Sequence, residues 1–231
     1  MPAFDRSDPD DARIVDRTPR TIGWQAHPTE TGRRTSHALS GPEGVWILDP
    51  LDAPGVDEAI ESLGPVVGVA VCSNMHSRDA ATVAERYDVP VTVPAWLDLT
   101  ADLDAPIERV DDRIGPWPVV RVPVPGWDEA IVIADDGSTL YVPDVLGTAP
   151  IYPVGPERIG LYPFARLRPP QSAFEDLTPD RILVGHGTSI TDDASDALET
   201  AFDGARRRLP RAIAENGLTH ARLLASVIAD R

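Results

Sequence analysis

The chain has 231 residues, which is enough for one domain with a sizeable core. Its 37 acidic residues against 21 basic ones give a formal net charge of -16. This balance excludes nucleic acid as the main partner, because phosphate binding requires clustered Lys and Arg. The single cysteine, Cys72, excludes an internal disulfide, and no apolar run approaches the roughly 18 residues of a membrane span.

The acidic surface carries a second signal. All 21 basic residues are Arg, and Asp clearly outnumbers Glu. A strongly acidic chain without Lys stays soluble where salt screens its self-repulsion, so we predict a halophilic protein from a salt-rich cytoplasm. A GC-rich genome would explain the missing Lys but not the excess of Asp. Residues 1–11 have no basic segment and no apolar stretch, so we expect no signal peptide and a cytoplasmic location.

The first half of the chain alternates strand-like and helical segments. Residues 1–18 are polar and Asp-rich and are predicted to form a flexible acidic tail, and residues 19–231 are predicted to form a single domain. Strand-like runs cover residues 21–26, 35–39, 45–48, 66–71 and 89–93. Helical spacing of apolar residues occurs twice between them, once at Val56, Ile60 and Leu63 and once at Ala80, Val83, Ala84 and Tyr87.

The second half repeats this order. Strand-like runs cover residues 119–124, 130–134, 139–142 and 182–184, and an Asp136-Gly137 turn joins the second to the third. Residues 149–170 are rich in Pro and are predicted to form a long loop. A helix is expected after Thr191 and a last helical region from Leu209. Mixed sheets with helices on their outer faces fit this order of elements.

Polar side chains follow three of these predicted strands. His76 and Asp79 follow residues 66–71, Asp144 follows residues 139–142, and His186 follows residues 182–184 between two glycines. In sheets flanked by helices, the loops at the carboxyl ends of strands form the ligand crevice. We therefore expect these four side chains to converge, and carboxylates and imidazoles are capable metal ligands.

At these residues the chain resembles the metallo-β-lactamase superfamily. The first motif of that family is His-x-His-x-Asp-His, and the four slots here hold Asn74, His76, Arg78 and Asp79. The last motif is a Gly-His-Gly turn, which residues 185–187 match in full. The resemblance covers about residues 21–210. It implies an α/β fold with two mixed sheets flanked by helices, a four-layer αββα sandwich, and metal-dependent hydrolysis.

Two further motifs of that family are kept in part. Pro125-Gly126 is present, but Trp127 stands in the slot of a ligand His. Pro143-Asp144 keeps the bridging acid and lacks the usual Gly. The resemblance implies that one metal site, which needs the slots of Asn74 and Trp127, is lost, because an amide is a poor zinc ligand and an indole offers only a donor N–H.

The second metal of the family would use the slots of Arg78, Asp79, Asp144 and His186, and His76 is left over from the first site. In one interpretation, Arg78 points outward and His76, Asp79, Asp144 and His186 are both the metal ligands and the catalytic residues. They would hold one divalent ion (zinc, manganese or iron) that acidifies a water. In the other, Arg78 replaces the metal and pairs with Asp144 or Asp79. A guanidinium about 5 Å from a divalent ion is repelled by about 6–7 kcal/mol at an effective dielectric constant near 20.

These patterns predict a hydrolase-like protein with at most one divalent ion, acting on a small ester, thioester or phosphoester. The alternative is a non-catalytic protein that binds a small anion or a partner protein through the same cleft. Without a metal, His76 or His186 remains a candidate general base. Arg78, Arg166 and Arg168 are the candidates for binding an anionic substrate, and pairing with the abundant Asp is the other role open to Arg166 and Arg168. Oligomeric state is left open.

Overall fold

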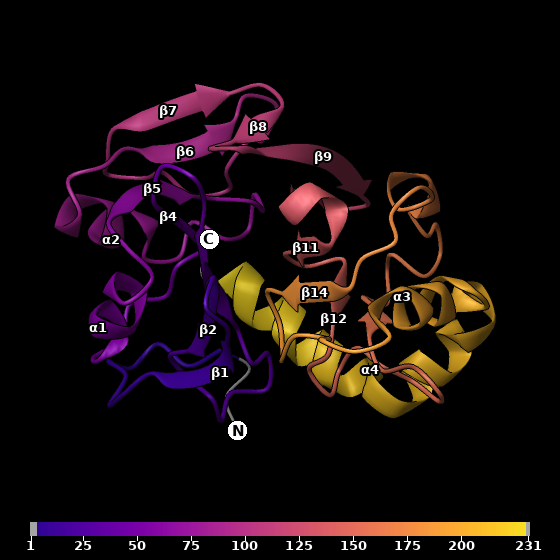
Figure 1. Cartoon of the computed structure of the whole chain (residues 1–231). Coiled ribbons are helices and arrows are strands. Elements are labelled where there is room, and N and C mark those ends of the chain that lie inside the picture. The colour runs from indigo at the N-terminus through magenta and orange to yellow at the C-terminus, as the bar shows by residue number, and fades with distance from the viewer. Residues whose placement is uncertain (1–3, 230–231) are drawn as a thin grey trace.

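The computed structural model describes the backbone of residues 4–229 and the side chains of residues 4–221. The chain forms two large mixed sheets with helices on their outer sides (Figure 1). The first sheet has the strand order β1-β2-β3-β4-β5-β6-β7. Its strands are β1 (Arg13–Arg17), β2 (Thr21–Gln25), β3 (Ser36–Ser40), β4 (Val45–Leu48), β5 (Val66–Ala70), β6 (Val91–Pro94) and β7 (Ile107–Val110).

The pairing within the first sheet changes at β4. Strands β1 to β4 are antiparallel, and β4 to β7 are parallel. Parallel neighbours need a crossover connection, and helices α1 (Val56–Glu61) and α2 (Ala80–Arg86) supply the first two crossovers. These two helices cover the outer side of this sheet (Figure 1).

The second sheet has the order β14-β11-β10-β9-β8, in which only β11 and β14 are parallel among the described pairs. Its strands are β8 (Arg113–Ile114), β9 (Trp117–Val124), β10 (Trp127–Ala134), β11 (Thr139–Val142) and β14 (Arg181–Val184). The remaining elements are the small sheet of β12 (Leu146–Gly147) and β13 (Gly160–Leu161), the 3-10 helices η1 (Asp135–Gly137) and η2 (Gln171–Ala173), and the helices α3 (Ala194–Phe202) and α4 (Ala205–Ala229).

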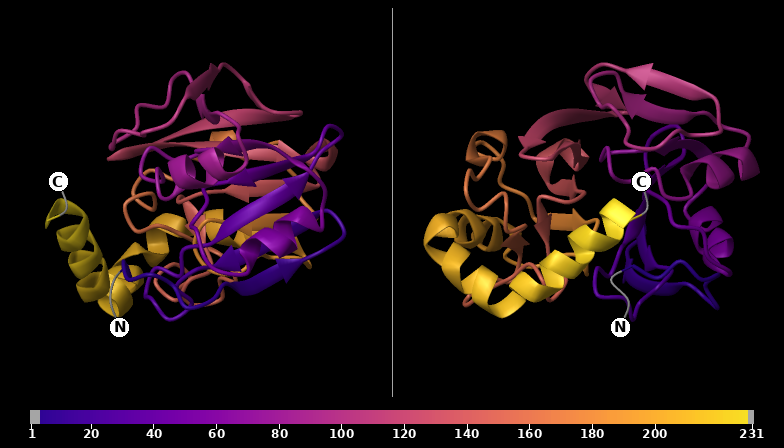
Figure 2. Two further views of the ribbon diagram at one scale, coloured as in Figure 1. Left: turned by 90° about the vertical axis from the view of Figure 1, so that its left-hand side faces the viewer. Right: turned by 180° about the vertical axis from the view of Figure 1, so that it is seen from behind.

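Alternation along the strands divides the core into layers, because successive side chains of a strand point to opposite faces. In β4, Ile47 packs with α1 and α2, whereas Leu48 packs toward the second sheet. In β10, Val132 faces the first sheet and Ile131 packs with α3. One apolar layer therefore lies between the sheets and one lies on each outer side, which is the predicted αββα order. Figure 2 shows α3 and α4 on the far side of the second sheet and α4 extending away from the body.

The strands predicted from the sequence are confirmed, with ends that shift by a few residues. The predicted tail of residues 1–18 needs correction, because residues 13–17 form β1 and pair with β2. Two contacts order this segment: Ile14 is partly buried against the core, and Arg181 holds both carboxylate oxygens of Asp16 at 2.9 and 3.0 Å. The short strands β7 and β8 escape prediction because they span only four and two residues and most of their side chains are exposed, so they form no apolar run. In the described part of the chain no helix is both long and apolar enough to cross a membrane.

Candidate functional site

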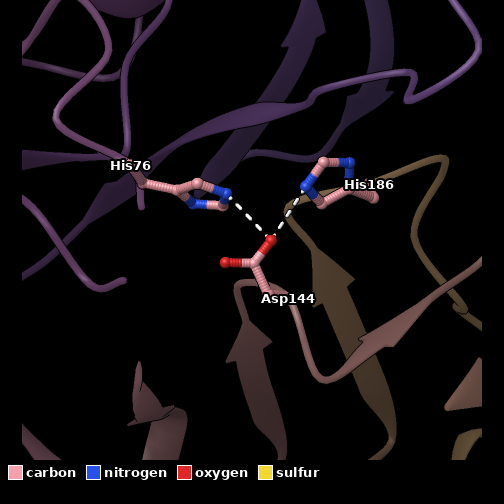
Figure 3. A group of neighbouring side chains, drawn as sticks. All are labelled: His76, Asp144 and His186. Carbon is pink, nitrogen blue, oxygen red and sulfur yellow. Dashed lines mark hydrogen bonds and ion pairs between the residues drawn. The ribbon is translucent and has the colours of Figure 1, made fainter. Parts of the chain in front are cut away.

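Three of the predicted residues meet at the carboxyl ends of β5, β11 and β14. The Nε2 atoms of His76 and His186 each lie 3.0 Å from the same Asp144 oxygen, Oδ1 (Figure 3). One potential ligand atom of each residue lies within 4.8 Å of the other two. The rings are buried and the Asp144 carboxylate is 15% exposed, so the carboxylate is the part of this cluster that solvent reaches.

The other ring nitrogen of each histidine has its own acceptor. His186 Nδ1 donates to the carbonyl oxygen of Gly32 at 2.8 Å, and His76 Nδ1 donates to Asp49 Oδ2 at 2.9 Å. A carbonyl oxygen has no hydrogen to give, so the proton of a neutral His186 sits on Nδ1 and its Nε2 presents a lone pair. The same holds for a neutral His76. Two lone pairs then face one negatively charged carboxylate oxygen, which is a repulsive arrangement. Either a metal ion between the three groups or a proton on one of the two Nε2 atoms makes it favourable.

The charges around the cluster favour His76 as the ring that takes a proton. Burial and Arg78 lower the pKa of His76, but Asp144 and Asp49 outweigh them and raise it above the ordinary value. Burial lowers the pKa of His186 despite its bond to Asp144. Burial also opposes ionisation of Asp144, yet the two histidines hold the pKa of this carboxyl well below its usual range. Asp144 is therefore an anion that needs cations or metal around it.

Arg78 points toward the cluster and joins segments of both halves. Its NH1 donates to the carbonyl oxygens of Thr35 and Asp49 at 3.0 and 2.8 Å, and its NH2 donates to that of Gly185 at 3.3 Å. The same NH2 lies 3.1 Å from His76 Nε2. The outward direction is therefore wrong, and so is the pairing with Asp144 or Asp79, because Arg78 forms no ion pair with any carboxylate in the described residues.

Asp79 lies outside the cluster, contrary to the prediction. Its Oδ2 accepts a hydrogen bond from the backbone N–H of Asp52 at 2.8 Å, on the side of α1 and α2. The physical reason is the backbone: Arg78 has a φ of 39°, in the left-handed region, and the turn it makes sends the next side chain away from His76. A ligand role for Asp79 is not supported by this geometry.

The two arginines of the long loop are also placed away from the cluster. Arg166 is fully buried, and its guanidinium holds both oxygens of Glu157 at 2.8 and 2.7 Å and the carbonyl oxygens of Leu161 and Tyr152. It fixes the loop and cannot reach a substrate, so the structural role is correct, with a Glu as its partner. Arg168 is exposed and no hydrogen bond joins it to the cluster.

Asn74 and Trp127, which stand where the resemblance implies ligand histidines, bind the protein itself. Trp127 Nε1 donates to Glu129 Oε2 at 2.8 Å. Asn74 Oδ1 accepts from the backbone N–H of Asp128 at 3.3 Å. Glu129 also accepts from the N–H groups of Asp144 and Val145, and burial together with Asp144 raises its pKa to about 8. Glu129 thus fixes the turn that carries Asp144.

Sequence analysis missed Asp49 and Glu129. Asp49 directly follows β4, so the criterion that selected the other polar residues, a position just past a strand, would have found it. Its buried carboxylate accepts from His76, from Tyr141 Oη at 2.6 Å and from the N–H of Cys72 at 2.7 Å. Glu129 gives a weaker signal, an acid on the otherwise apolar face of β10 that it shares with Ile131 and Ile133.

An aromatic wall leads from the cluster toward the surface. Tyr152 packs against the ring of His186 at 5.7 Å between ring centroids, and Tyr162 packs against Tyr152 and Trp127. Gly147 allows the close approach of Tyr152, because a Cβ at position 147 would lie 2.8 Å from that ring. The long loop therefore supplies one side of the cluster.

Layers and cluster together define a class of protein: an αββα sandwich whose strand ends gather histidines and an aspartate, the metallo-β-lactamase fold. No known family profile matches the chain, and no curated protein matches it. Solved structures do match. DIM-1 metallo-beta-lactamase has a TM-score of 0.55 at 12% identity, covering 85% of this chain and 98% of that chain.

Two other similar structures are of metal-containing proteins. TTHA1623 in a di-iron-bound form has a TM-score of 0.53 at 19% identity, over 72% of this chain and 93% of that chain. The metal-soaked Flv1 flavodiiron core from Synechocystis sp. PCC6803 has a TM-score of 0.56 at 11% identity, over 84% of this chain and 61% of that chain. Identities this low show the fold alone. The chain has the metallo-β-lactamase fold, as its motifs predicted.

Proposed function

We propose that this protein is a hydrolase-like protein that binds at most one divalent ion through His76, Asp144 and His186. The observation that carries the proposal is the pair of Nε2 atoms that face one carboxylate oxygen while both Nδ1 atoms are held by other acceptors. Metal-binding histidines have this arrangement, since the second hydrogen bond fixes the tautomer and aims the free nitrogen. Two imidazoles and a carboxylate suit zinc, manganese or iron.

The ligand set supports one ion and not two. The slots of Asn74 and Trp127 hold side chains that bind Asp128 and Glu129, and Asp79 is turned away. A bound divalent ion supplies Lewis acidity and lowers the pKa of a bound water. The residues of this chain orient that chemistry: Asp49 and Gly32 aim the two rings, and Glu129 holds the turn of Asp144.

The substrate class we propose is a small ester, thioester or phosphoester, taken up from a salt-rich cytoplasm. The acidic surface argues against nucleic acid, as above. The aromatic wall of Tyr152 and Tyr162 gives the cluster one apolar side, which suits a small organic substrate better than a purely ionic one.

The ion content of the purified protein tests the proposal. Elemental analysis of protein prepared without added metal should find about one ion per chain. The variant His186→Ala should lose the ion. The matched variant His27→Ala should keep it, because His27 lines a different hollow, with Asp5 and Asp52, and forms no hydrogen bond with the cluster. Metal at background in the unchanged protein, also after dialysis against zinc or manganese, would overturn the single-ion proposal.

A panel of generic esters, thioesters and phosphoesters tests the activity. Turnover that disappears in His186→Ala and persists in His27→Ala supports hydrolysis at this cluster. Turnover that survives in His186→Ala would move the chemistry elsewhere.

One observation favours a second candidate, a non-catalytic protein that binds a small anion or a partner. Arg78 NH2 lies 3.1 Å from His76 Nε2 and is held by backbone carbonyls, so a fixed positive charge already stands beside the cluster. In this case the guanidinium replaces the ion. Arg78→Asp should then create metal binding that the unchanged protein lacks. If the metal content of the Arg78→Asp variant also stays at background, Arg78 is not the obstacle to metal binding, and the cluster lacks more than one ligand.

A further inference from the structure

One carboxylate oxygen of Asp49 accepts hydrogen bonds from two side chains. Oδ2 accepts from His76 Nδ1 at 2.9 Å and from Tyr141 Oη at 2.6 Å. The other oxygen, Oδ1, accepts from the backbone N–H of Cys72 at 2.7 Å. All four residues are buried, so bulk water does not compete with these donors. The bond between Asp49 and His76 therefore depends on the bond between Asp49 and Tyr141, because both use the same oxygen.

Tyr141 is held in the layer between the two sheets. It lies in β11, an inner strand of the second sheet, and its ring packs edge-on against His37 at 5.4 Å between ring centroids. Asp49 directly follows β4 of the first sheet and has a φ of 47°, which few residues other than glycine adopt. Burial and the charge of Asp49 raise the pKa of Tyr141 well above its ordinary value, so the hydroxyl keeps its proton and stays a donor.

The two histidines of the cluster have different acceptors at Nδ1. His186 donates to the neutral carbonyl oxygen of Gly32, whereas His76 donates to the carboxylate of Asp49. A carboxylate at Nδ1 makes the other ring nitrogen a stronger base and a stronger ligand. Hydrogen bonds to a carboxylate lower its basicity in turn, so the Tyr141 hydroxyl weakens the effect of Asp49 on His76.

We propose that Tyr141 is a positioning residue that limits the pull of Asp49 on the Nδ1 proton of His76 and so sets how strongly His76 Nε2 binds an ion. The part that concerns the ion rests on the function proposed above. A purely structural hydroxyl would, when removed, weaken both the fold and ion binding. The proposed role predicts opposite signs, because a protein without this hydroxyl is less stable but binds the ion more tightly.

Tyr141→Phe tests the inference without any metal, because it keeps the ring and removes the hydroxyl. NMR of metal-free protein with isotope-labelled histidine reports on the protons of the ring nitrogens. The Nδ1 proton of His76 should move downfield, since its hydrogen bond to Asp49 becomes stronger. The Nδ1 proton of His186 has a different acceptor and should stay in place as an internal reference.

Zinc affinity, measured by competition with a chelator, is the second readout. Tyr141→Phe should bind zinc about threefold to tenfold more tightly, an effect below the roughly 10–100-fold of residues that bond a ligand directly. Its urea midpoint should fall at the same time. In an Asp49→Asn background, whose amide is a weaker acceptor, the same change should alter zinc affinity by less than about twofold, because Tyr141 acts only through the carboxylate.

Tyr87→Phe is the matched control. It removes the same kind of bond, from Tyr87 Oη to Asp57 at 2.9 Å at the end of α2, and should change neither the NMR signals nor the zinc affinity. Incorporation of fluorotyrosine, whose hydroxyl is a stronger donor, should move the His76 signal upfield. This measurement keeps the test decisive if Tyr141→Phe does not fold.

A His76 signal that stays in place or moves upfield in Tyr141→Phe would overturn the inference, whatever the metal content. Where the unchanged protein binds zinc, an affinity that is equal or weaker in the folded variant would overturn it as well. If the unchanged protein binds no zinc but the His76 signal moves downfield, the single-ion proposal fails and the control of His76 by Tyr141 stands.

Discussion

His76 and His186 show how a hydrogen bond on one ring atom decides what the other can do. With Nδ1 occupied by Asp49 or by the Gly32 carbonyl, each Nε2 is left to face Asp144, and the choice is between a proton and a metal ion. Arg78 adds a fixed charge to this choice. The repulsion between this guanidinium and a divalent ion would offset a large share of typical metal affinity. Whether a metal ion binds beside Arg78 therefore distinguishes the two proposed functions.

Glu157 is predicted to be critical for stability. Glu157→Gln leaves the fully buried Arg166 without its anion and should lower the free energy of unfolding by about 3–5 kcal/mol. Asp192→Asn removes the exposed pair with Arg158 and should change it by less than about 0.5 kcal/mol. Urea unfolding of both variants measures the difference. Equal effects would mean that the buried pair adds no more than a surface pair.

Glu30 is predicted to make stability depend on pH. Burial opposes its ionisation, but the hydrogen bonds and charge of Arg34 outweigh burial, so its pKa is lowered from 4.5. A carboxyl with a lowered pKa stabilises the folded state fully above its unfolded value, and this contribution is lost as pH falls through the folded value.

Glu30→Gln should therefore destabilise the protein at neutral pH, and the gap to the unchanged protein should narrow as the pH is lowered below 4.5. Denaturant unfolding at a series of pH values measures the gap. A gap that stays constant, or widens in acid, contradicts the assignment. The pair also orders the loop of Gly32, so the variant reports on the support of His186.

At the scale of elements, two glycines in the second half have opposite requirements. Gly160 in β13 lies against the backbone of Tyr152, where a Cβ would come within 2.3 Å of its carbonyl oxygen. Gly217 lies in α4, where the nearest atom to a Cβ is 3.5 Å away. Replacing Gly by Ala therefore tests close packing at position 160 and helix propensity at position 217.

Gly160→Ala should destabilise the protein by about 1–3 kcal/mol, because backbone cannot yield as a flexible side chain does. Gly217→Ala should stabilise it by up to about 1 kcal/mol, because Ala favours the helix. Thermal unfolding of the pair gives both signs in one experiment. Gly160→Ala should also disturb the packing of Tyr152 on His186. A variant as stable as the unchanged protein would contradict the prediction, because it would mean that β13 can shift away from Tyr152 at little cost.

For the whole molecule, the net charge of -16 produces a general repulsion that destabilises the fold, whereas local ion pairs stabilise it. Salt weakens exposed pairs such as Arg158–Asp192, which destabilises, and it screens the repulsion among all acids, which stabilises. Exposed pairs contribute only about 0–1 kcal/mol each, so relief of the general repulsion should outweigh their weakening.

The melting temperature is therefore predicted to rise as KCl is raised from about 0.1 to about 1 M, where the screening length falls from about 10 to about 3 Å. Potassium chloride is the suitable salt, because sulfate would also strengthen apolar burial. A melting temperature that is constant or falls over this range contradicts a halophilic surface. The result bears on the proposed salt-rich location and not on the cluster.

The sequence alone determined the order of the apolar strands and of the helices between them, because apolar periodicity is a local property, and it missed the partly exposed strands β1, β7 and β8. It also placed His76, Asp144 and His186 at strand ends that the fold gathers. Only the tertiary structure decided where neighbouring side chains point. Asp79 turns away because Arg78 is left-handed, and Arg166 is buried because Glu157 lies beside it. Asp49 reaches His76 across 27 positions of the chain. Such directions depend on partners distant in sequence, which no local pattern records.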